Sequence, residues 1–319
     1  MPKEQRKFAD DGWAIWIDGD DVSNIYINDW LNPKGKSYVD LAVHIYGIKA
    51  CTGLHVYVPF SVSQEEIEDV SLFFQDKKFL QATFGTACIV DYMKNQHASE
   101  IAYNGKTVDI VHISTLDYKL SPLSEGTLID VDLEKLQPCL DNDEVYFLWR
   151  MPHKSLNRIF HKRINVGNVL SRLQDLITTP VLSEKFNYSI RINEARRLPD
   201  EITKKGAFYR QKLNRAVITL SIDEDYELND TGCERIRRLE DNLYQGYLPK
   251  NYKCADMITY QWNQGLENNE QGHFNFYYNI AKNSISRGSM FLYVIILLAL
   301  NVAGELLSDL VKILINWNP

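Results

Sequence analysis

The sequence lacks the short motifs that mark most enzyme and metal-site families. Its five cysteines are odd in number, widely spaced and without a CxxC pair, which argues against a disulfide framework and a thiolate metal site. Its seven histidines form no HExxH or HxH pattern, and GxSxG, GxGxxG and a phosphate-cradling glycine loop are all missing. The sequence therefore predicts no metal, no cofactor and no catalytic activity.

The N-terminal segment also lacks the apolar core of a secretory signal, since MPKEQRKFADD is charged throughout. Together with the unpaired cysteines, this segment predicts that the bulk of the chain lies in a reducing cytosol.

Charge is unevenly distributed along the chain. Residues 150–215 hold 15 Lys and Arg against 5 Asp and Glu, a net charge of +10, whereas residues 1–149 hold 12 against 24, a net charge of −12. The middle segment predicts an anionic partner. Duplex DNA is not expected, because it requires a broad basic surface that the acidic remainder of the chain does not supply.

Short strands are predicted throughout the first 150 residues. Seven segments are rich in β-branched and aromatic residues, and several alternate apolar with polar positions. One interruption, Ser63-Gln64-Glu65-Glu66, is a capping-box pattern that predicts a helix over residues 65–74. The predicted strands are 13–18, 23–28, 38–47, 53–60, 107–113, 127–133 and 144–151. The expected fold class is α+β, with a cytosolic region dominated by antiparallel sheet.

Beyond residue 150 the composition changes, and helices and strands are mixed. The patterns predict a helix over 165–177, strands near 185–192 and 216–222, a charged helix near 233–243 and a polar loop over 263–271. We therefore expect three regions: a β-rich domain over 1–150, a basic α+β region for ligand binding or oligomerisation over 151–283, and a C-terminal helix over 284–319.

The C-terminal segment is the longest apolar run in the sequence. Residues 290–304 contain one polar side chain, Asn301, and the helical pattern continues to Trp317. A helix over 290–317 is about 42 Å long, enough to cross a bilayer with some tilt. Lys282 and Arg287 precede it, as expected on a cytosolic side, and Trp317 stands where an interfacial aromatic would. The alternative is a helix packed on the protein body.

Polar residues in this helix fall on one stripe at steps of about four and seven. A polar stripe on a single span predicts that several copies associate, because polar side chains in a membrane usually face a bundle interior or a water-filled lumen. The expected pore-lining residues are Asn301, Glu305, Ser308 and Lys312.

The basic segment carries aromatic side chains among its cations. Arginine with nearby aromatic faces suits a nucleotide or a single-stranded oligonucleotide, with phosphate bound by Arg and base stacked on a ring. The candidate ligand-binding residues are Arg158, Lys162, Arg163, Arg191, Arg196, Arg197, Arg210, Tyr188 and Tyr209. Two other interpretations stay open: the segment packs on the acidic region or is a solvated face, or it is attracted to anionic lipid headgroups.

The acidic run Asp18-Gly19-Asp20-Asp21 follows a predicted strand, where carboxylates could bind Mg²⁺. The simpler interpretation is a tight hairpin rich in Asp and Gly. A soluble, metal-dependent nucleic-acid-processing enzyme is therefore an alternative function, and a membrane-anchored scaffold without a pore is another.

The arrangement of an apolar C-terminal span with a polar stripe, preceded by a basic and aromatic segment, resembles the membrane effectors of bacterial anti-phage defence operons. The Hailong-type effector, a ligand-controlled channel whose partner is a nucleotidyltransferase, is the member it resembles most. The resemblance implies a homo-oligomeric pore in the inner (cytoplasmic) membrane, with the bulk of the chain cytosolic and controlled by a nucleotide signal.

Overall fold

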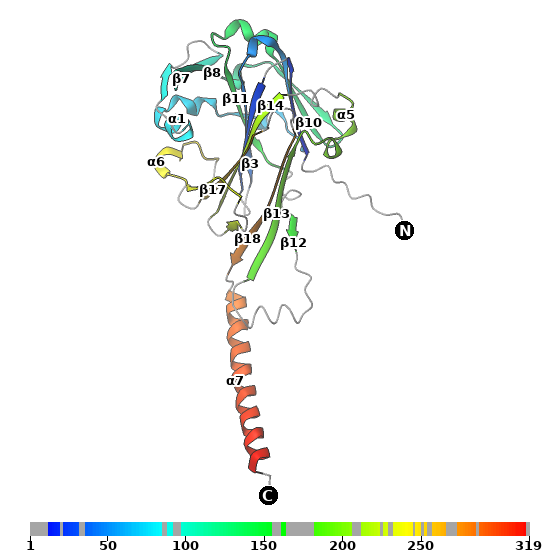
Figure 1. Cartoon of the computed structure of the whole chain (residues 1–319), viewed down its shortest axis with the longest axis vertical. Coiled ribbons are helices and arrows are strands. Elements are labelled where there is room, and N and C mark those ends of the chain that lie inside the picture. The colour runs from blue at the N-terminus through cyan, green and yellow to red at the C-terminus, as the bar shows by residue number, and fades with distance from the viewer. Residues whose placement is uncertain are drawn as a thin grey trace. The chain divides into compact units, whose positions relative to one another are not determined.

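The computed structural model divides into two compact units (Figure 1). The first contains residues 1–161, 188–224 and 230–278, and the second contains 162–187, 225–229 and 279–319. The structure describes residues 12–316 apart from 20–21, 32–35, 85–87, 92–96, 155–160, 164–181, 206–211, 224–225, 229–231, 245, 250–251, 254–256, 266–272 and 285–286.

The strands of the first unit belong to two sheets, which we call sheet 1 and sheet 2. Sheet 1 has the order β13-β1-β4-β10-β9. Its strands are β13 (Leu182–Ile192, whose last residues lie in this unit), β1 (Gly12–Gly19), β4 (Cys51–Val58), β10 (Gly126–Asp132) and β9 (Tyr118–Leu123).

Sheet 2 has the order β16-β17-β14-β2-β3-β11-β8-β7-β6, with β5 beside β11. Its strands are β16 (Arg235–Arg238), β17 (Met257–Gly265), β14 (Lys212–Asp223), β2 (Val22–Trp30), β3 (Tyr38–Ile45), β11 (Val145–Pro152), β8 (Lys106–Val111), β7 (Ala98–Tyr103), β6 (Cys88–Asp91) and β5 (Glu68–Asp69).

The seven strands predicted before residue 150 are confirmed, as are those near 185–192 and 216–222. The antiparallel expectation is right only in part, because both sheets are mixed. β1 pairs in parallel with β13, β14 with β2, and β11 with β8. The β14–β2 pairing also brings residues beyond 150 into the same sheet as the first strands of the chain, although composition changes near that position.

The hairpin predicted at Asp18-Gly19-Asp20-Asp21 is wrong. β1 ends at Gly19 and β2 begins at Val22, but β1 belongs to sheet 1 and β2 to sheet 2, so this short connection passes between sheets. Gly19 has a φ of +154°, and a Cβ there would lie 2.5 Å from the carbonyl oxygen of Ala50. The glycine is therefore required by a close backbone approach.

Two predicted helices are also corrected. The capping box of Ser63 and Glu66 forms, yet it opens only a single 3₁₀ turn, Gln64–Glu66. The next residues become β5, which pairs with β11, before a second 3₁₀ turn over Ser71–Gln75. The helix predicted near 233–243 is instead the strand β16 followed by α6 (Asp241–Tyr244). In both places strand pairing overrides the local helical pattern.

Of the other predicted segments, residues 165–177 lie outside the described residues, as does most of the loop predicted over 263–271. Residues 263–265 of that loop belong to β17.

Both sheets have an apolar outer face covered by short elements. On sheet 2, α1 (Lys77–Phe84) and the segment around α6 bring Phe79, Tyr244 and Tyr247 onto a buried cluster with Trp30 and Leu148. On sheet 1, α5 (Asp200–Thr203) places Ile202 against Ala14, Trp16 and Tyr57. Because both faces of β1, β3 and β11 are buried, these strands read as continuous apolar runs rather than as strict alternations.

The second unit holds β15 (Tyr226–Leu228), the later part of β18 (Phe274–Ser284), with which β15 pairs antiparallel, and the helix α7 (Arg287–Asn316). The described structure also contains β12 (His161–Arg163), α2 (Leu133–Leu136) and four further 3₁₀ turns, over Ile48–Ala50, Ile113–Thr115, Gln137–Cys139 and Ala195–Arg197. The chain passes from the first unit to the second within β18 and reaches α7 two residues after β18 ends.

The buried cluster on sheet 2 contains an ion pair between Asp40 and Arg150. We expect Arg150→Met to lower the free energy of unfolding by about 3–5 kcal/mol, because it leaves the Asp40 carboxylate buried without its cation. Urea unfolding measures the change. Lys135→Met, which removes an exposed pair with Asp132, is the control and should leave the midpoint unchanged. Equal stability of Arg150→Met and the parent would show that the pair does not stabilise the fold.

Candidate ligand-binding site

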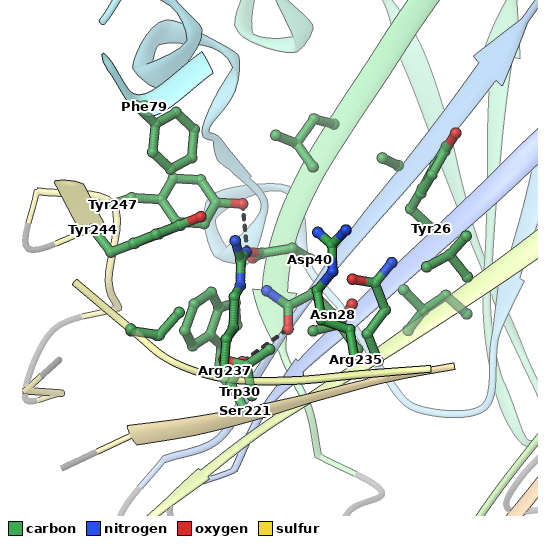
Figure 2. A pocket seen from close by; sticks show the side chains of 18 of the residues that line it. Tyr26, Asn28, Trp30, Asp40, Phe79, Ser221, Arg235, Arg237, Tyr244 and Tyr247 are labelled. Carbon is green, nitrogen blue, oxygen red and sulfur yellow. Dashed lines mark hydrogen bonds between the residues drawn. The ribbon is translucent and has the colours of Figure 1, made fainter. Parts of the chain in front are cut away.

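A cavity of about 350 Å³ lies on the outer face of sheet 2, between the sheet and the segments around α1 and α6. Figure 2 shows the labelled side chains that surround it. Its aromatic lining consists of Tyr26, Trp30, Phe74, Phe79, Tyr146, Tyr244 and Tyr247. Its polar lining consists of Asn28, Asp40, Arg215, Thr219, Ser221, Arg235, Arg237, Thr259 and Gln261. The cavity therefore combines apolar rings with a few converging polar groups, as ligand pockets do.

Asp40 is fully engaged within the protein. Arg150 binds it with two hydrogen bonds, Nε to Oδ1 at 2.6 Å and Nη2 to Oδ2 at 2.8 Å. Trp30 Nε1 and the Tyr247 hydroxyl also donate to Oδ2, at 2.6 and 2.7 Å. Burial alone would lower the pKa of Arg150, but the Asp40 carboxylate raises it above its ordinary value. The negative charge of Asp40 is thus neutralised before any ligand arrives.

Tyr247 connects this ion pair to the wall of the cavity. Its carbonyl oxygen accepts a hydrogen bond from Arg150 Nη1 at 2.6 Å, and the Arg150 guanidinium lies 4.6 Å from the centre of its ring. Burial, followed by the nearby Asp40 carboxylate, raises the pKa of the Tyr247 hydroxyl well above 10. The hydroxyl therefore stays a proton donor, and it fixes the segment after α6 over the sheet.

Three arginines give the cavity its positive charge. Arg235 and Arg237 come from β16, two residues apart and hence on the same face of the strand, and both reach into the cavity in Figure 2. The Arg237 guanidinium lies 5.2 Å from the centre of the Tyr244 ring. Arg215, from β14, donates to the side-chain oxygen of Asn263. Such a group of guanidiniums beside aromatic rings favours a planar anionic ligand.

Several polar side chains of the cavity have no protein partner among the residues that the structure describes. This holds for Arg235, Thr219 and Gln261. Asn28 accepts a hydrogen bond from Ser221 at 3.2 Å through Oδ1, while its amide N–H groups make no bond to the described residues. These groups can bond to a ligand without breaking an interaction of the fold.

Of the binding residues predicted from the sequence, the described ones, Arg191, Arg196 and Arg197, do not line this cavity. Arg191 and Arg196 both form ion pairs with Glu194, and Arg191 Nη1 lies 2.8 Å from Glu194 Oε2. Part of the charge of these two arginines is therefore neutralised within the chain. Arg197 is half-buried beside them. Arg158, Arg210 and Tyr209 lie outside the described residues, as do the side chains of Lys162, Arg163 and Tyr188. Their role in ligand binding stays a prediction.

The predicted pore-lining residues all lie on α7, whose segment Tyr293–Ile313 is 21 residues long with a mean hydropathy of 2.0 and is not buried. Asn301, Glu305, Ser308 and Lys312 are exposed. Lys312 Nζ lies 3.0 Å from a carboxylate oxygen of Asp309, one turn earlier. The length, apolar composition and exposure of α7 indicate a membrane anchor.

Asp18, one of the carboxylates considered for metal binding, binds a histidine instead. His55 Nε2 lies 2.9 Å from Asp18 Oδ2, its Nδ1 lies 2.6 Å from Asp130 Oδ1, and its ring stacks on Trp16 with centroids 4.8 Å apart. Asp20 and Asp21 lie outside the described residues. Among the described residues, no group of three or more His, Cys, Asp or Glu is arranged to hold a metal ion.

No protein-family model matches the chain, and no curated protein matches it either. The function must therefore be argued from the site itself.

The sequence places Arg215 in the basic segment, but the arginines Arg235 and Arg237 were not predicted as binding residues. The sequence pattern that could have identified them is the alternation Arg235-Ile236-Arg237, which places both arginines on one face of a strand. This pattern was missed because the segment was interpreted as a helix.

Burial lowers the pKa of His55, but hydrogen bonds to Asp130 and Asp18 outweigh it, so the pKa is raised above 6.5. A raised histidine pKa stabilises the fold fully below pH 6.5, and this contribution is lost as the pH rises through the raised pKa. We expect an NMR titration of the His55 ring to show the raised pKa and Asp130→Asn to lower it. Glu134→Gln is the control. An unchanged pKa in Asp130→Asn would contradict the assigned cause.

Proposed function

We propose that this protein is a membrane-anchored, non-enzymatic effector that assembles into a ligand-controlled pore. The observation that carries the proposal is an unburied, apolar helix α7 on the same chain as a β-rich body with an arginine-lined cavity. The helix supplies the membrane segment, and the cavity supplies a place where an anionic ligand can act on the protein.

The dimensions of α7 support the membrane segment. Its 30 residues extend for about 45 Å at the usual rise per residue, and the hydrocarbon core is about 30 Å thick. Large side chains such as Leu298, Leu306 and Leu310 are about two-thirds exposed, at 61%, 64% and 59%. In water this surface costs roughly 25 cal/mol per Å², which transfer to lipid removes.

The polar stripe of α7 supports oligomerisation. Asn301, Glu305, Ser308 and Lys312 are separated by four, three and four residues, so they share one side of the helix. An ionised carboxylate that faces hydrocarbon costs several kcal/mol. A bundle in which the stripes of several copies face a common lumen removes most of that cost, and one helix cannot form such a lumen.

Control by a ligand follows as a population shift. A ligand that binds one arrangement of the body more tightly moves the oligomer towards that arrangement. The connection to the membrane segment is short, since two residues separate β18 from α7. A change in β18 therefore reaches α7 through very little intervening chain.

The proposed setting is bacterial anti-phage defence, with α7 in the inner membrane and the body in the cytosol. It follows the resemblance to ligand-controlled membrane effectors whose partner enzyme makes a nucleotide signal. Two alternative functions would behave differently from the proposed pore. A membrane-anchored scaffold would have the same features but would conduct no ions, and a soluble enzyme would use the cavity but would not require a membrane.

We expect the full-length protein to sediment with membranes and to be extracted only by detergent, because α7 exposes an apolar surface. Residues 1–287 should stay in the supernatant. Fractionation by high-speed centrifugation measures both. Full-length protein that remains soluble without detergent would exclude the anchor.

We expect Glu305→Leu to preserve membrane insertion but to reduce or abolish ion flux, because the change removes the carboxylate from the proposed lumen. Flux from liposomes with reconstituted protein measures the effect. Ile296→Val, a small change away from the stripe, is the matched control and should conduct like the parent. Unchanged flux in Glu305→Leu, or a monomeric protein in mild detergent, contradicts the pore and leaves an anchored scaffold.

A further inference from the structure

We propose that the cavity on sheet 2 binds one nucleoside phosphate unit, with the phosphate at the β16 arginines and the base over the centre of the sheet. This inference rests on the proposed function, in which the body binds an anionic ligand, and it names the site and the chemical class of that ligand.

A row of polar side chains crosses sheet 2 beneath the cavity. The strand register places Asn28 opposite Thr219, Thr219 opposite Gln261, and Gln261 opposite Arg235. Directly paired residues in adjacent strands point to the same face of a sheet, and all four line the cavity. On its other side Asn28 is paired with Asp40, and Asp40 with Arg150, so the row continues into the buried ion pair.

The two ends of this row differ in chemistry. At the edge strand, Arg235 and the neighbouring Arg237 present guanidinium groups. Toward the centre, Asn28 presents a neutral amide, and Gln261, directly beside Arg235, presents another. With neighbouring strands about 4.8 Å apart, Asn28 and Arg235 are separated by three strand spacings, or about 14 Å. A ligand that pairs with all the polar side chains of this row has a negatively charged end and a neutral end, and the neutral end both donates and accepts hydrogen bonds.

The charged end fits phosphate. Arg235 has no partner among the described residues, and Arg237 and Arg215 lie in the same lining. Asp40, the carboxylate of this lining, is already neutralised by Arg150. Arg235 therefore offers its guanidinium to an anion, with Arg237 two residues along the same strand, and guanidinium binds phosphate oxygens with two parallel hydrogen bonds.

The neutral end fits a nucleobase. The amides of Asn28 and Gln261 supply donors and an acceptor of the kind that bind base edges. Tyr26 and Tyr146 lie beside this end, with ring centroids 6.0 Å apart, and offer aromatic surface to a planar ring. An inorganic phosphate or a sugar phosphate would leave these amides and rings unused.

The size of the cavity limits the ligand to one unit. Its volume of about 350 Å³ is near the lower end of the usual range of about 300–1,000 Å³ for ligand pockets. One nucleoside phosphate is enclosed, either free or as the end of an oligonucleotide whose other units lie outside the cavity.

The test is calorimetric binding to the full-length protein in detergent, with adenosine, guanosine, cytidine and uridine 5′-monophosphates as probes. Ribose 5-phosphate, the free nucleosides and inorganic phosphate are the comparisons. We expect at least one monophosphate to bind more tightly than its nucleoside and than ribose 5-phosphate, each by about tenfold or more, since each fragment leaves polar groups of the row unpaired. If a dinucleotide of the preferred base binds at least as tightly as the monophosphate, the ligand is the end of an oligonucleotide. If it binds more weakly, the ligand is a free mononucleotide.

Variants assign the two ends. Arg235→Ala should weaken both the monophosphate and ribose 5-phosphate, whereas Asn28→Ala, at the other end of the row, should weaken the monophosphate and leave ribose 5-phosphate unchanged. Arg238→Ala, an exposed arginine of the same strand that does not line the cavity, is the matched control. Thermal unfolding confirms that each variant is folded.

Three outcomes would overturn the inference. Equal binding of monophosphate and ribose 5-phosphate would show an anion site without base recognition, and the proposed function would stand. Loss of binding in Arg196→Ala but not in Arg235→Ala would move the site to the patch around Glu194. If no probe binds, the cavity is not a nucleotide site. The liposome flux experiment tests the pore independently of this result.

Discussion

The buried pair of Asp40 and Arg150 is the interaction on which the candidate site depends. Two charges removed from water are tolerated only when every group around them is satisfied. Here that condition brings together β3 and β11, which carry the pair, and the segment after α6, which contributes both the hydroxyl and the carbonyl of Tyr247. Trp30 supplies a further donor from β2. The wall of the cavity is thus fixed by the same bonds that neutralise Asp40.

This arrangement also explains how a chain of net charge −7 can contain a cavity whose lining has a net positive charge. The overall charge repels anions at long range, but exposed charges are screened within about 8 Å at physiological salt. Inside the cavity the local balance decides: Arg150 neutralises Asp40, and the other charged residues of the lining are Arg215, Arg235 and Arg237. Guanidinium contacts provide specificity for position as well as for charge, because the planar group binds an anion in a fixed geometry.

The sequence predicts the strands well and the site poorly, for a common reason. Segments such as 38–47 and 144–151 carry β-branched and aromatic residues whose preference agrees with their burial. Around residues 65–74 and 233–243, local patterns favour helix, but pairing with β11 and β17 decides the structure. The polar row from Asn28 to Arg235 comes from β2 and from three strands between residues 212 and 265, and only the register of those strands brings it together.

The α7 segment was predictable because the evidence for it is local. Its apolar composition and its polar stripe are properties of one continuous stretch, and no pairing with a distant segment can alter them. The same holds for the capping box at Ser63, which forms even though the helix does not continue. Composition thus identifies a helix long and apolar enough to cross a membrane, whereas a cavity built across a mixed sheet requires the topology.

The energy required for gating places a condition on the proposed mechanism. Moving an equilibrium from 1:99 to 99:1 requires a ligand to prefer one state by about 10⁴-fold, or about 5.5 kcal/mol. A cavity of one nucleotide unit can gain only part of this from a difference in a few hydrogen bonds, at about 1.5–3 kcal/mol for a bond to a charged group. In a homo-oligomer each copy contributes its own cavity, so the preferences add when all copies change together. The polar stripe of α7 already requires an oligomer for pore formation. In that oligomer the summed binding preferences of several cavities allow a small ligand to control the pore.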